Sequence, residues 1–254
     1  MPFKIVIPAR YASSRLPGKP LLDIAGKPMI QHVYNRAKES LASEVIIATD
    51  DSRIEQVAKG FGADVCMTRA DHPSGTDRLA EVATIKHFAD DDIIINVQGD
   101  EPCLPASLIN QVAEDLQQHP DADIATLYHQ IDQEKQVFDA NVVKVVMDRQ
   151  GYALYFSRAP IPWMRDHFDQ PSTLPADLPH YRHIGLYGYR AKFLTHYAEL
   201  EPCIVEQEES LEQLRALYYG KKIHLTMAQI DPGHGIDTEK DLLAVRDLLN
   251  SSSG

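Results

Sequence analysis

Residues 4–21 read KIVIPARYASSRLPGKPL, and this stretch decides the fold. Its first four residues form an apolar run typical of a buried strand, and a helical pattern begins near Met29. Three cations, Arg10, Arg15 and Lys19, lie in the connection between them. A strand that ends in such a loop offers backbone N–H groups and fixed positive charge to a polyphosphate. The sequence therefore predicts a nucleotide-binding edge at the end of this strand.

The loop differs from the two common phosphate-binding motifs. The chain contains neither a GxxxxGK[ST] string nor a GxGxxG turn. Its net charge is −12, so three cations within ten residues form a local positive site against an acidic background. The alternative is an ordinary solvated loop. Pro17 and Pro20 favour the binding role, because they stiffen the loop and lower the entropy cost of holding the cations around a ligand.

Composition excludes several classes of protein. The chain has 254 residues, of which 44% are hydrophobic and 24% charged, as in ordinary globular proteins. No apolar run approaches the roughly 20 residues of a membrane helix, and the acidic balance argues against a nucleic-acid partner. Cys66, Cys103 and Cys203 form no CxxC pair, so we interpret them as buried or incidental thiols. The chain enters a predicted core strand almost at once, so we expect no signal peptide. We therefore expect a cytoplasmic protein with no membrane insertion.

Strand and helix signals alternate along the first half of the chain. The predicted strands are short and rich in Val and Ile, and each is followed by an amphipathic helical pattern. These strands are Lys4–Pro8, Val45–Thr49, Asp64–Met67 and Ile93–Gln98. Such alternation indicates an α/β fold with a Rossmann-like, mostly parallel sheet flanked by helices. Because ligands bind at the carboxyl ends of such strands, the polar clusters after the four strands should converge on one edge.

The second half changes character. Val142–Asp148, Tyr152–Ser157 and Arg182–Arg190 predict strands, and a Pro- and Asp-rich excursion, Pro160–Pro179, predicts a lid or a dimer arm. Helix signals return at Ala191–Leu200 and then at Ser210–Tyr219, followed by a strand near Ile223–Gln229 and a last helix after Thr238.

Two further stretches supply carboxylates. Residues 94–102, IINVQGDEP, predict an apolar strand with Gln98 at its tip and Asp100 projecting into the crevice. A carboxylate there suits Mg²⁺, which prefers hard oxygen ligands, although a turn or helix-capping role for Asp100 is also open. Residues 230–238, IDPGHGIDT, carry Asp237 before a helix. Asp237 is either a helix-entry carboxylate or a partner of Asp100 in holding metal.

Several strings together resemble one family, the 3-deoxy-D-manno-octulosonate (KDO) cytidylyltransferases. They are PARYASSRLPGKPL, ADHPSGTDRLAE, NVQGDEP, YALYFSRAPIPW, RHIGLYGYR, LEQLR and GIDT. The resemblance runs from the first strand to the last helix. Sialic-acid cytidylyltransferases share the cationic loop in looser form, and the Gly-rich loop of sugar-1-phosphate nucleotidyltransferases is absent.

The resemblance implies a reaction and an organisation. CTP and KDO would give CMP-KDO and pyrophosphate with Mg²⁺ as cofactor, by in-line attack of the sugar's anomeric hydroxyl on the α-phosphorus. The product would serve lipopolysaccharide or capsule synthesis in a bacterial cytoplasm, and the enzyme would be a homodimer. The implied division is a nucleotide-binding core (1–140), a smaller sugar-binding and dimerisation region (141–202), a return to the core (203–250) and a flexible tail (251–254).

The resemblance also implies residue roles. Catalysis would depend on Arg10, Arg15, Lys19, Asp100 and Asp237, with the two aspartates binding the metal. The nucleotide contacts would come from the first loop, the segment after the third strand and the tip of the fourth: Pro8, Ala9, Arg10, Ser13, Lys19, Ser74, Gly75, Arg78 and Gln98. The sugar contacts would be Gln98, Arg158, His183, Tyr187, Glu212 and Gln213, with Arg158 as partner of the sugar carboxylate. Asp77 stands where the family usually has Glu, which puts a direct contact from this position in doubt.

Alternatives remain for several of these residues. Arg158 could belong to a structural ion pair, His183 and Tyr187 could be core residues, and Glu212 and Gln213 could be solvated. Two rival functions also remain: a cytidylyltransferase for another acid sugar, such as sialic acid or an 8-amino KDO analogue, and a non-catalytic nucleotide-binding regulator.

Overall fold

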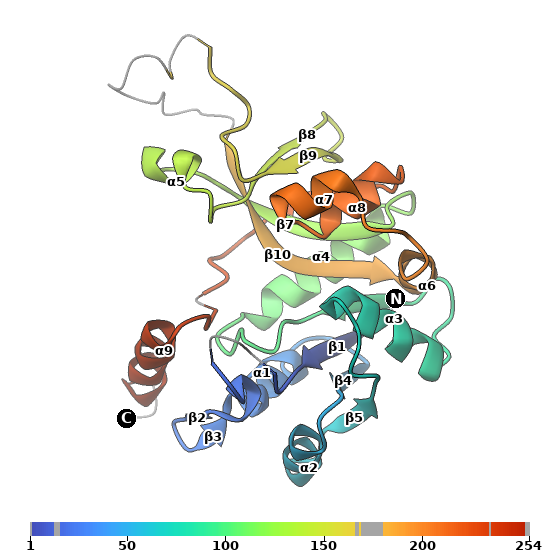
Figure 1. Ribbon diagram of the computed structural model, residues 1–254, viewed down its shortest axis with the longest axis vertical. Coiled ribbons are helices and arrows are strands. Elements are labelled where there is room, and N and C mark those ends of the chain that lie inside the picture. Colours follow the sequence, from blue (N-terminus) through green and yellow to red (C-terminus); the bar gives the residue numbers. More distant parts are fainter. Residues whose placement is uncertain (1, 13–15, 166–167, 169–179, 234, 252–254) are drawn as a thin grey trace.

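A nine-stranded sheet forms the centre of the protein (Figure 1). The computed structural model describes residues 2–12, 16–165, 168, 180–233 and 235–251. The strands of the main path run in the spatial order β11-β7-β10-β6-β1-β4-β5, and β8 and β9 extend the sheet from β10. Their bounds are β1 Phe3–Ala9, β4 Glu44–Thr49, β5 Asp64–Met67, β6 Ile93–Asn96, β7 Ile124–Gln130, β8 Lys144–Met147, β9 Ala153–Ser157, β10 Tyr181–Arg190 and β11 Ile223–Met227.

Helices cover both faces of this sheet. One face packs against α1 (Met29–Lys38), α2 (Ser52–Gly60) and α4 (Ala106–Gln118). The other packs against α3 (Gly75–Ile85), α6 (Ala191–Tyr197) and α8 (Gln213–Tyr218). The remaining elements are a short hairpin and peripheral helices: β2 Asp23–Ile24, β3 Lys27–Pro28, the 3₁₀ turn η1 Lys19–Leu21, α5 Glu134–Phe138, α7 Ile204–Glu209 and α9 Glu239–Ser251. The α/β class predicted from the sequence is confirmed.

The sequence of β1 explains its central position. Ile5 and Ile7 lie in the core under α1, whereas Val6 lies in the core on the opposite face. Strands buried on both faces read as continuous runs of Val and Ile, and such strands suit a parallel sheet. The strand β1 pairs in parallel with β4 and with β6. Their carboxyl ends therefore meet at one edge, as the alternation of elements predicts.

One strand departs from the parallel pattern. The strand β10 lies between β6 and β7 and is antiparallel to both. Residues 141–202 therefore contribute a strand to the middle of the central sheet as well as the β8–β9 extension. The predicted excursion at 160–179 lies largely outside the described residues, as do 252–254 of the predicted tail, whereas Ser251 ends α9.

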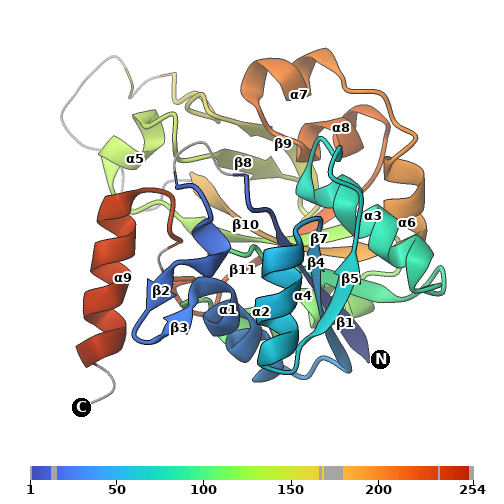
Figure 2. The same ribbon diagram turned by 60° about the horizontal axis from the view of Figure 1, so that its bottom comes forward.

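The C-terminal helix returns to the N-terminal half of the chain. In both views α9 lies beside the β2–β3 hairpin (Figures 1 and 2). Arg246 of α9 donates to the main-chain oxygen of Asp23 through Nε at 2.9 Å and Nη2 at 2.7 Å. Leu242 and Val245 are buried against Ile24 and Met29. This docking holds the segment that precedes α9, which carries Asp237, close to the first loop.

Candidate active site

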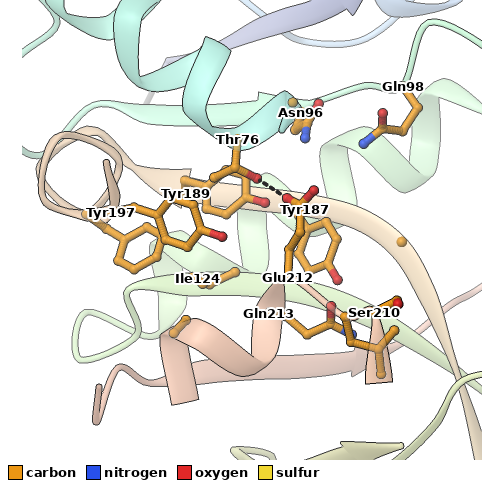
Figure 3. Close-up of a pocket in the computed structure, with 15 residues that line it drawn as sticks. Thr76, Asn96, Gln98, Ile124, Tyr187, Tyr189, Tyr197, Ser210, Glu212 and Gln213 are labelled. Atoms are coloured by element: carbon orange, nitrogen blue, oxygen red, sulfur yellow. Dashed lines mark hydrogen bonds between the residues drawn. The ribbon is translucent and has the colours of Figure 1, made fainter. Parts of the chain in front are cut away.

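Two adjoining cavities open at the carboxyl edge of the sheet. The loop cavity, of about 370 Å³, is lined by the exit of β1, the cationic loop, the turn after β6 and Asp237. The tyrosine cavity, of about 300 Å³, lies between α3, β10, α6 and α8 (Figure 3). Gly75 and Gln98 line both cavities. Two ligands bound side by side would therefore meet at these two residues.

The turn after β6 lies against the exit of β1. A Cβ atom at Gly99 would be 2.8 Å from the main-chain oxygen of Pro8, closer than real Cβ contacts allow. Glycine at this position therefore lets the two strand ends approach each other. Pro8, Ala9 and Gly99 all line the loop cavity, which presents main-chain groups to a ligand.

Lys19 brings two distant carboxylates together. Its Nζ lies 2.7 Å from Oδ2 of Asp100 and 3.5 Å from Oδ1 of Asp237. The main-chain N–H of Ile236 donates to the main-chain oxygen of Asp100 at 2.9 Å, which fixes the loop that carries Asp237. The predicted convergence of Lys19, Asp100 and Asp237 is what the structure shows. Their catalytic and metal-binding roles stay predictions.

Glu101 adds a third carboxyl group, which the sequence analysis did not propose. Its Oε2 is buried and has no hydrogen-bond partner among the described residues. Burial, together with the negative charges of Asp100 and Asp237, raises the pKa of Glu101 to about 8. Oxygen donors grouped around the ammonium of Lys19 are the ligand type that Mg²⁺ prefers. The donor set, with this orphaned oxygen and an ammonium standing where a cation would bind, fits a divalent metal.

The two predicted arginines of the nucleotide site have different environments. Arg10 lines the loop cavity, and its Nη2 is buried with no hydrogen-bond partner among the described residues. Arg78 is fully buried, with Nη2 2.9 Å from Oδ1 of Asp50 and Nη1 donating to Oγ1 of Thr68. Burial lowers the pKa of the Arg78 guanidinium. Arg10 can thus reach a ligand directly, whereas Arg78 lies behind the cavity wall.

Ser74 and Asp77 cap the N-terminus of α3. Oγ of Ser74 accepts from the main-chain N–H of Asp77 at 3.2 Å and donates to Oδ2 of Asp77 at 2.6 Å. The Asp77 carboxylate therefore faces Ser74, and Asp77 lines neither the loop cavity nor the tyrosine cavity. Ser74 is the capping residue of α3, and the Asp77 carboxylate holds its hydroxyl in place. The cap fixes Gly75 at the junction of the two cavities.

The tyrosine cavity contains four of the six predicted sugar contacts. Its lining includes Gln98, Tyr187, Glu212 and Gln213 (Figure 3). Oγ1 of Thr76 donates to Oε2 of Glu212 at 3.0 Å, and burial raises the pKa of Glu212. Five further polar side chains of this lining were not predicted as sugar contacts, because only the fold brings them together: Thr76, Asn96, Tyr189, Tyr197 and Ser210.

Two predicted sugar contacts lie elsewhere. The guanidinium of Arg158 donates to three main-chain oxygens, those of Glu209 at 2.7 Å, Ala140 at 2.9 Å and Ser210 at 3.4 Å. Arg158 lines neither cavity, and these bonds tie the residue after β9 to the end of α7 and to the loop before β8. Its predicted contact with a sugar carboxylate therefore has no support in the structure. His183 lines a neighbouring cavity, with Nε2 3.0 Å from Oγ1 of Thr126.

The ring of His183 is neutral and packed among other side chains. Burial lowers its pKa to about 3. Its centroid is 5.3 Å from that of Tyr187 and 5.0 Å from that of Phe156. This position supports Tyr187 from behind, in line with the core alternative for His183. Ser13, predicted in the nucleotide site, and Arg15, predicted as catalytic, lie outside the described residues.

A cationic loop and an acidic cluster face one cavity, and a polar cavity for a second ligand adjoins it. On this Rossmann-like sheet the arrangement defines a nucleotidyltransferase, an enzyme that joins a nucleotide to an acceptor. None of the helices within the described ranges is long and apolar enough to cross a membrane.

Comparisons with known proteins define the family. Residues 4–223 match the cytidylyltransferase family model. The chain is 58% identical over 252 residues to the 3-deoxy-manno-octulosonate cytidylyltransferase of Hahella chejuensis, covering 99% of both chains. It is 57% identical to that of Nitrosococcus oceani over 251 residues, covering 98% of this chain and 97% of the relative. The chain belongs to the 3-deoxy-manno-octulosonate cytidylyltransferase family.

A solved structure supports the same assignment. The structure of CMP:2-keto-3-deoxy-manno-octonic acid synthetase complexed with CTP superimposes with a TM-score of 0.89. It is 44% identical in sequence, and the match covers 99% of this chain and 100% of that one. A 4-diphosphocytidyl-2C-methyl-D-erythritol synthase from Anaerococcus prevotii, at 12% identity and a TM-score of 0.61, shares the fold alone.

Proposed function

We propose that the protein transfers CMP from CTP to 3-deoxy-D-manno-octulosonate, giving CMP-KDO and pyrophosphate. Full-length relatives carry the name of this activity, and a solved relative was complexed with CTP. The observation that carries the proposal is the contact of Lys19 with both Asp100 and Asp237 in the loop cavity. Cationic and acidic groups at one point suit a triphosphate and the divalent cation that accompanies it.

Each cavity would take one substrate. In the loop cavity, main-chain groups of Pro8 and Ala9 would contact the cytosine, while Arg10 and Lys19 would hold the phosphates. The sugar would occupy the tyrosine cavity, with hydroxyl groups near Tyr187 and Glu212. Its anomeric hydroxyl would then meet the α-phosphorus at the junction of the cavities, and pyrophosphate would leave in line.

Catalysis would depend on positioning and charge. Asp100 and Asp237, with Glu101 beside them, would hold Mg²⁺, which when bound offsets phosphate charge and lowers the pKa of a nearby hydroxyl. Arg10 and Lys19 would stabilise the charge that develops on the leaving pyrophosphate. Holding both substrates at one junction converts a reaction between two anions into an intramolecular one. This scheme uses neither a covalent intermediate nor a histidine base.

The carboxylate of the sugar needs a partner other than Arg158. In KDO this carboxylate is bonded to the anomeric carbon, so it lies next to the attacking hydroxyl. No Lys, Arg or His is among the described residues that line the tyrosine cavity. We therefore propose that the carboxylate points toward the junction, where Arg10, Lys19 and a bound Mg²⁺ would supply positive charge.

We also propose that the enzyme is a homodimer, in the bacterial cytoplasm, where its product would serve lipopolysaccharide or capsule synthesis. Trp163 and Phe138 are 59% and 49% exposed. Each packs against Phe168, with ring centroids 4.6 and 5.0 Å apart, so the three rings form one aromatic surface cluster. Exposed apolar clusters of this kind mark interfaces. Light scattering on the Phe138→Ser/Trp163→Ser variant should give a monomer, and the exposed Leu41→Ser control should keep the wild-type mass.

A panel assay tests the activity. Pyrophosphate release would be measured with each nucleoside triphosphate and with KDO, its 8-amino analogue and sialic acid, in the presence of Mg²⁺. We expect release only with CTP and KDO. Pyrophosphate release with CTP and a different acid sugar would show that this sugar, and not KDO, is the substrate. Binding of CTP without pyrophosphate release for any acid sugar would favour the non-catalytic nucleotide-binding regulator.

A further inference from the structure

Lys19 occupies the position in which a metal ion would bind the two aspartates. Its ammonium contacts one oxygen of each carboxylate, at 2.7 and 3.5 Å. Both carboxylate oxygens contact the same nitrogen atom, so they lie close to each other. The side chain of Lys19 is 12% exposed, whereas those of Asp100 and Asp237 are 37% and 61% exposed. The cation lies inside, and the carboxylates remain accessible to an ion from solvent.

The backbone around this cluster is fixed. Lys19 opens η1, where its main-chain N–H donates to the oxygen of Leu16 at 3.1 Å, and that of Leu21 donates to the oxygen of Gly18 at 2.8 Å. Gly18 has φ of +67°, a conformation that glycine adopts without strain. The loop of Asp237 is held by the main-chain bond from Ile236 to Asp100. Only the lysine side chain needs to move for the carboxylates to become available.

We propose that Lys19 is a removable counterion, which holds Asp100 and Asp237 together until the nucleotide phosphates draw its ammonium away and leave both carboxylates to the metal. This inference rests on the proposed use of CTP and Mg²⁺. It gives Lys19 two successive partners, carboxylates first and phosphates second. Because coupling between ligands is reciprocal, nucleotide and metal each strengthen the binding of the other.

The charges of Lys19, Asp100 and Asp237 determine whether Lys19 raises or lowers the affinity for a metal ion. Without nucleotide, one ammonium offsets one of the two aspartate charges and competes with an incoming cation. Removing the ammonium leaves both negative charges for the metal. A unit charge removed at 3 to 4 Å near a protein surface changes cation affinity by at least about tenfold, even after solvent screening. Lys19→Met should therefore bind metal about tenfold more tightly than the wild type without nucleotide.

The test is a titration with Mn²⁺ alone, in which free Mn²⁺ is followed by electron paramagnetic resonance. Lys4→Met is the matched control, because it also removes a lysine paired to an aspartate, Asp92 at 2.8 Å, and changes the net charge equally. Lys19→Arg keeps the charge and should retain weak binding. Tighter binding by Lys19→Met alone supports the proposal. Equal or weaker binding than the wild type, or equal tightening in Lys4→Met, overturns it.

A second titration, in saturating α,β-methylene CTP, tests the exchange of partners. Lys19→Met should bind Mn²⁺ no more tightly than the wild type in this titration, because the ammonium of the wild type would now contact phosphate. A persistent tenfold advantage would overturn the exchange. Neither titration needs the sugar, so these results stand apart from the pyrophosphate panel: a protein that shows the counterion effect but releases no pyrophosphate would refute the activity alone.

Discussion

A buried histidine at the opposite edge of the sheet gives the sharpest stability prediction. His224 of β11 has Nδ1 2.8 Å from Oδ2 of Asp115 on α4, and Nε2 3.0 Å from the main-chain oxygen of Gln150. Both partners are acceptors, so both ring nitrogens must donate, and the ring is an imidazolium. It stacks on His119 with centroids 3.5 Å apart. The charged ring thus joins a helix, a strand and the turn before β9.

The pKa of His224 gives the direction of the pH dependence. Burial alone would lower this pKa, but the hydrogen bond and charge of Asp115 and the carbonyl of Gln150 outweigh it, and the pKa is raised above 6.5. The folded state therefore keeps a proton that the unfolded chain releases above about pH 6.5. The stabilisation is complete below pH 6.5 and is lost as pH rises through the folded pKa. A difference of one bound proton makes the free energy of unfolding change by up to about 1.4 kcal/mol per pH unit.

Urea unfolding between pH 5.5 and 9 measures this slope. We expect the free energy of unfolding of the wild type to fall above pH 6.5 relative to that of His224→Gln, so that the two curves converge at high pH. His129→Gln, an exposed histidine, should follow the wild type. A constant difference between wild type and His224→Gln over the whole range would refute the imidazolium.

Three further predictions concern catalysis and packing. Asp100→Asn should abolish pyrophosphate release while retaining much of the affinity for CTP in calorimetry, and near-normal turnover would remove Asp100 from the metal site. Lys19→Met should lower kcat by about a hundredfold or more, roughly 3 kcal/mol of transition-state stabilisation, and unchanged steady-state kinetics would exclude that role. Gly188→Ala should destabilise the fold by about 1–3 kcal/mol in urea, because its Cβ would lie 2.9 Å from two buried side chains. Gly185→Ala on the same strand meets nothing within 4 Å, and an equal loss there would contradict the packing argument.

The strands β1, β4, β5 and β6 could be predicted because their signals are local. Each is a run of Val and Ile that ends in polar residues, and the carboxyl-end rule placed those polar residues on one edge. This rule places Lys19 and Asp100 at the same edge, and the family resemblance adds Asp237 to them. The family strings then added the sugar-side residues Tyr187, Glu212 and Gln213, which the fold does bring to one cavity.

Nonlocal pairing set the limit of the prediction. The strand β7, Ile124–Gln130, was not predicted, and nothing in its sequence indicates that β10 separates it from β6. Arg158 was predicted to bind the sugar carboxylate, but its partners in the structure include main-chain oxygens at the end of α7 and in the loop before β8. Glu101 could not be singled out from the sequence, because its burial depends on the loop at Gly235, more than a hundred residues away in sequence.

Main-chain contacts, rather than side-chain packing, set the spacing of the acidic cluster. Gly233 has φ of +82°, and a Cβ there would lie 3.2 Å from the main-chain oxygen of Cys103. Ile236 donates its main-chain N–H to Asp100. The loop of Asp237 is thus bonded backbone to backbone with the loop of Asp100, whatever ion lies between the carboxylates. In the proposed mechanism, two carboxylates on bonded backbones with a movable lysine between them would provide both states that catalysis needs, one before and one after the nucleotide binds.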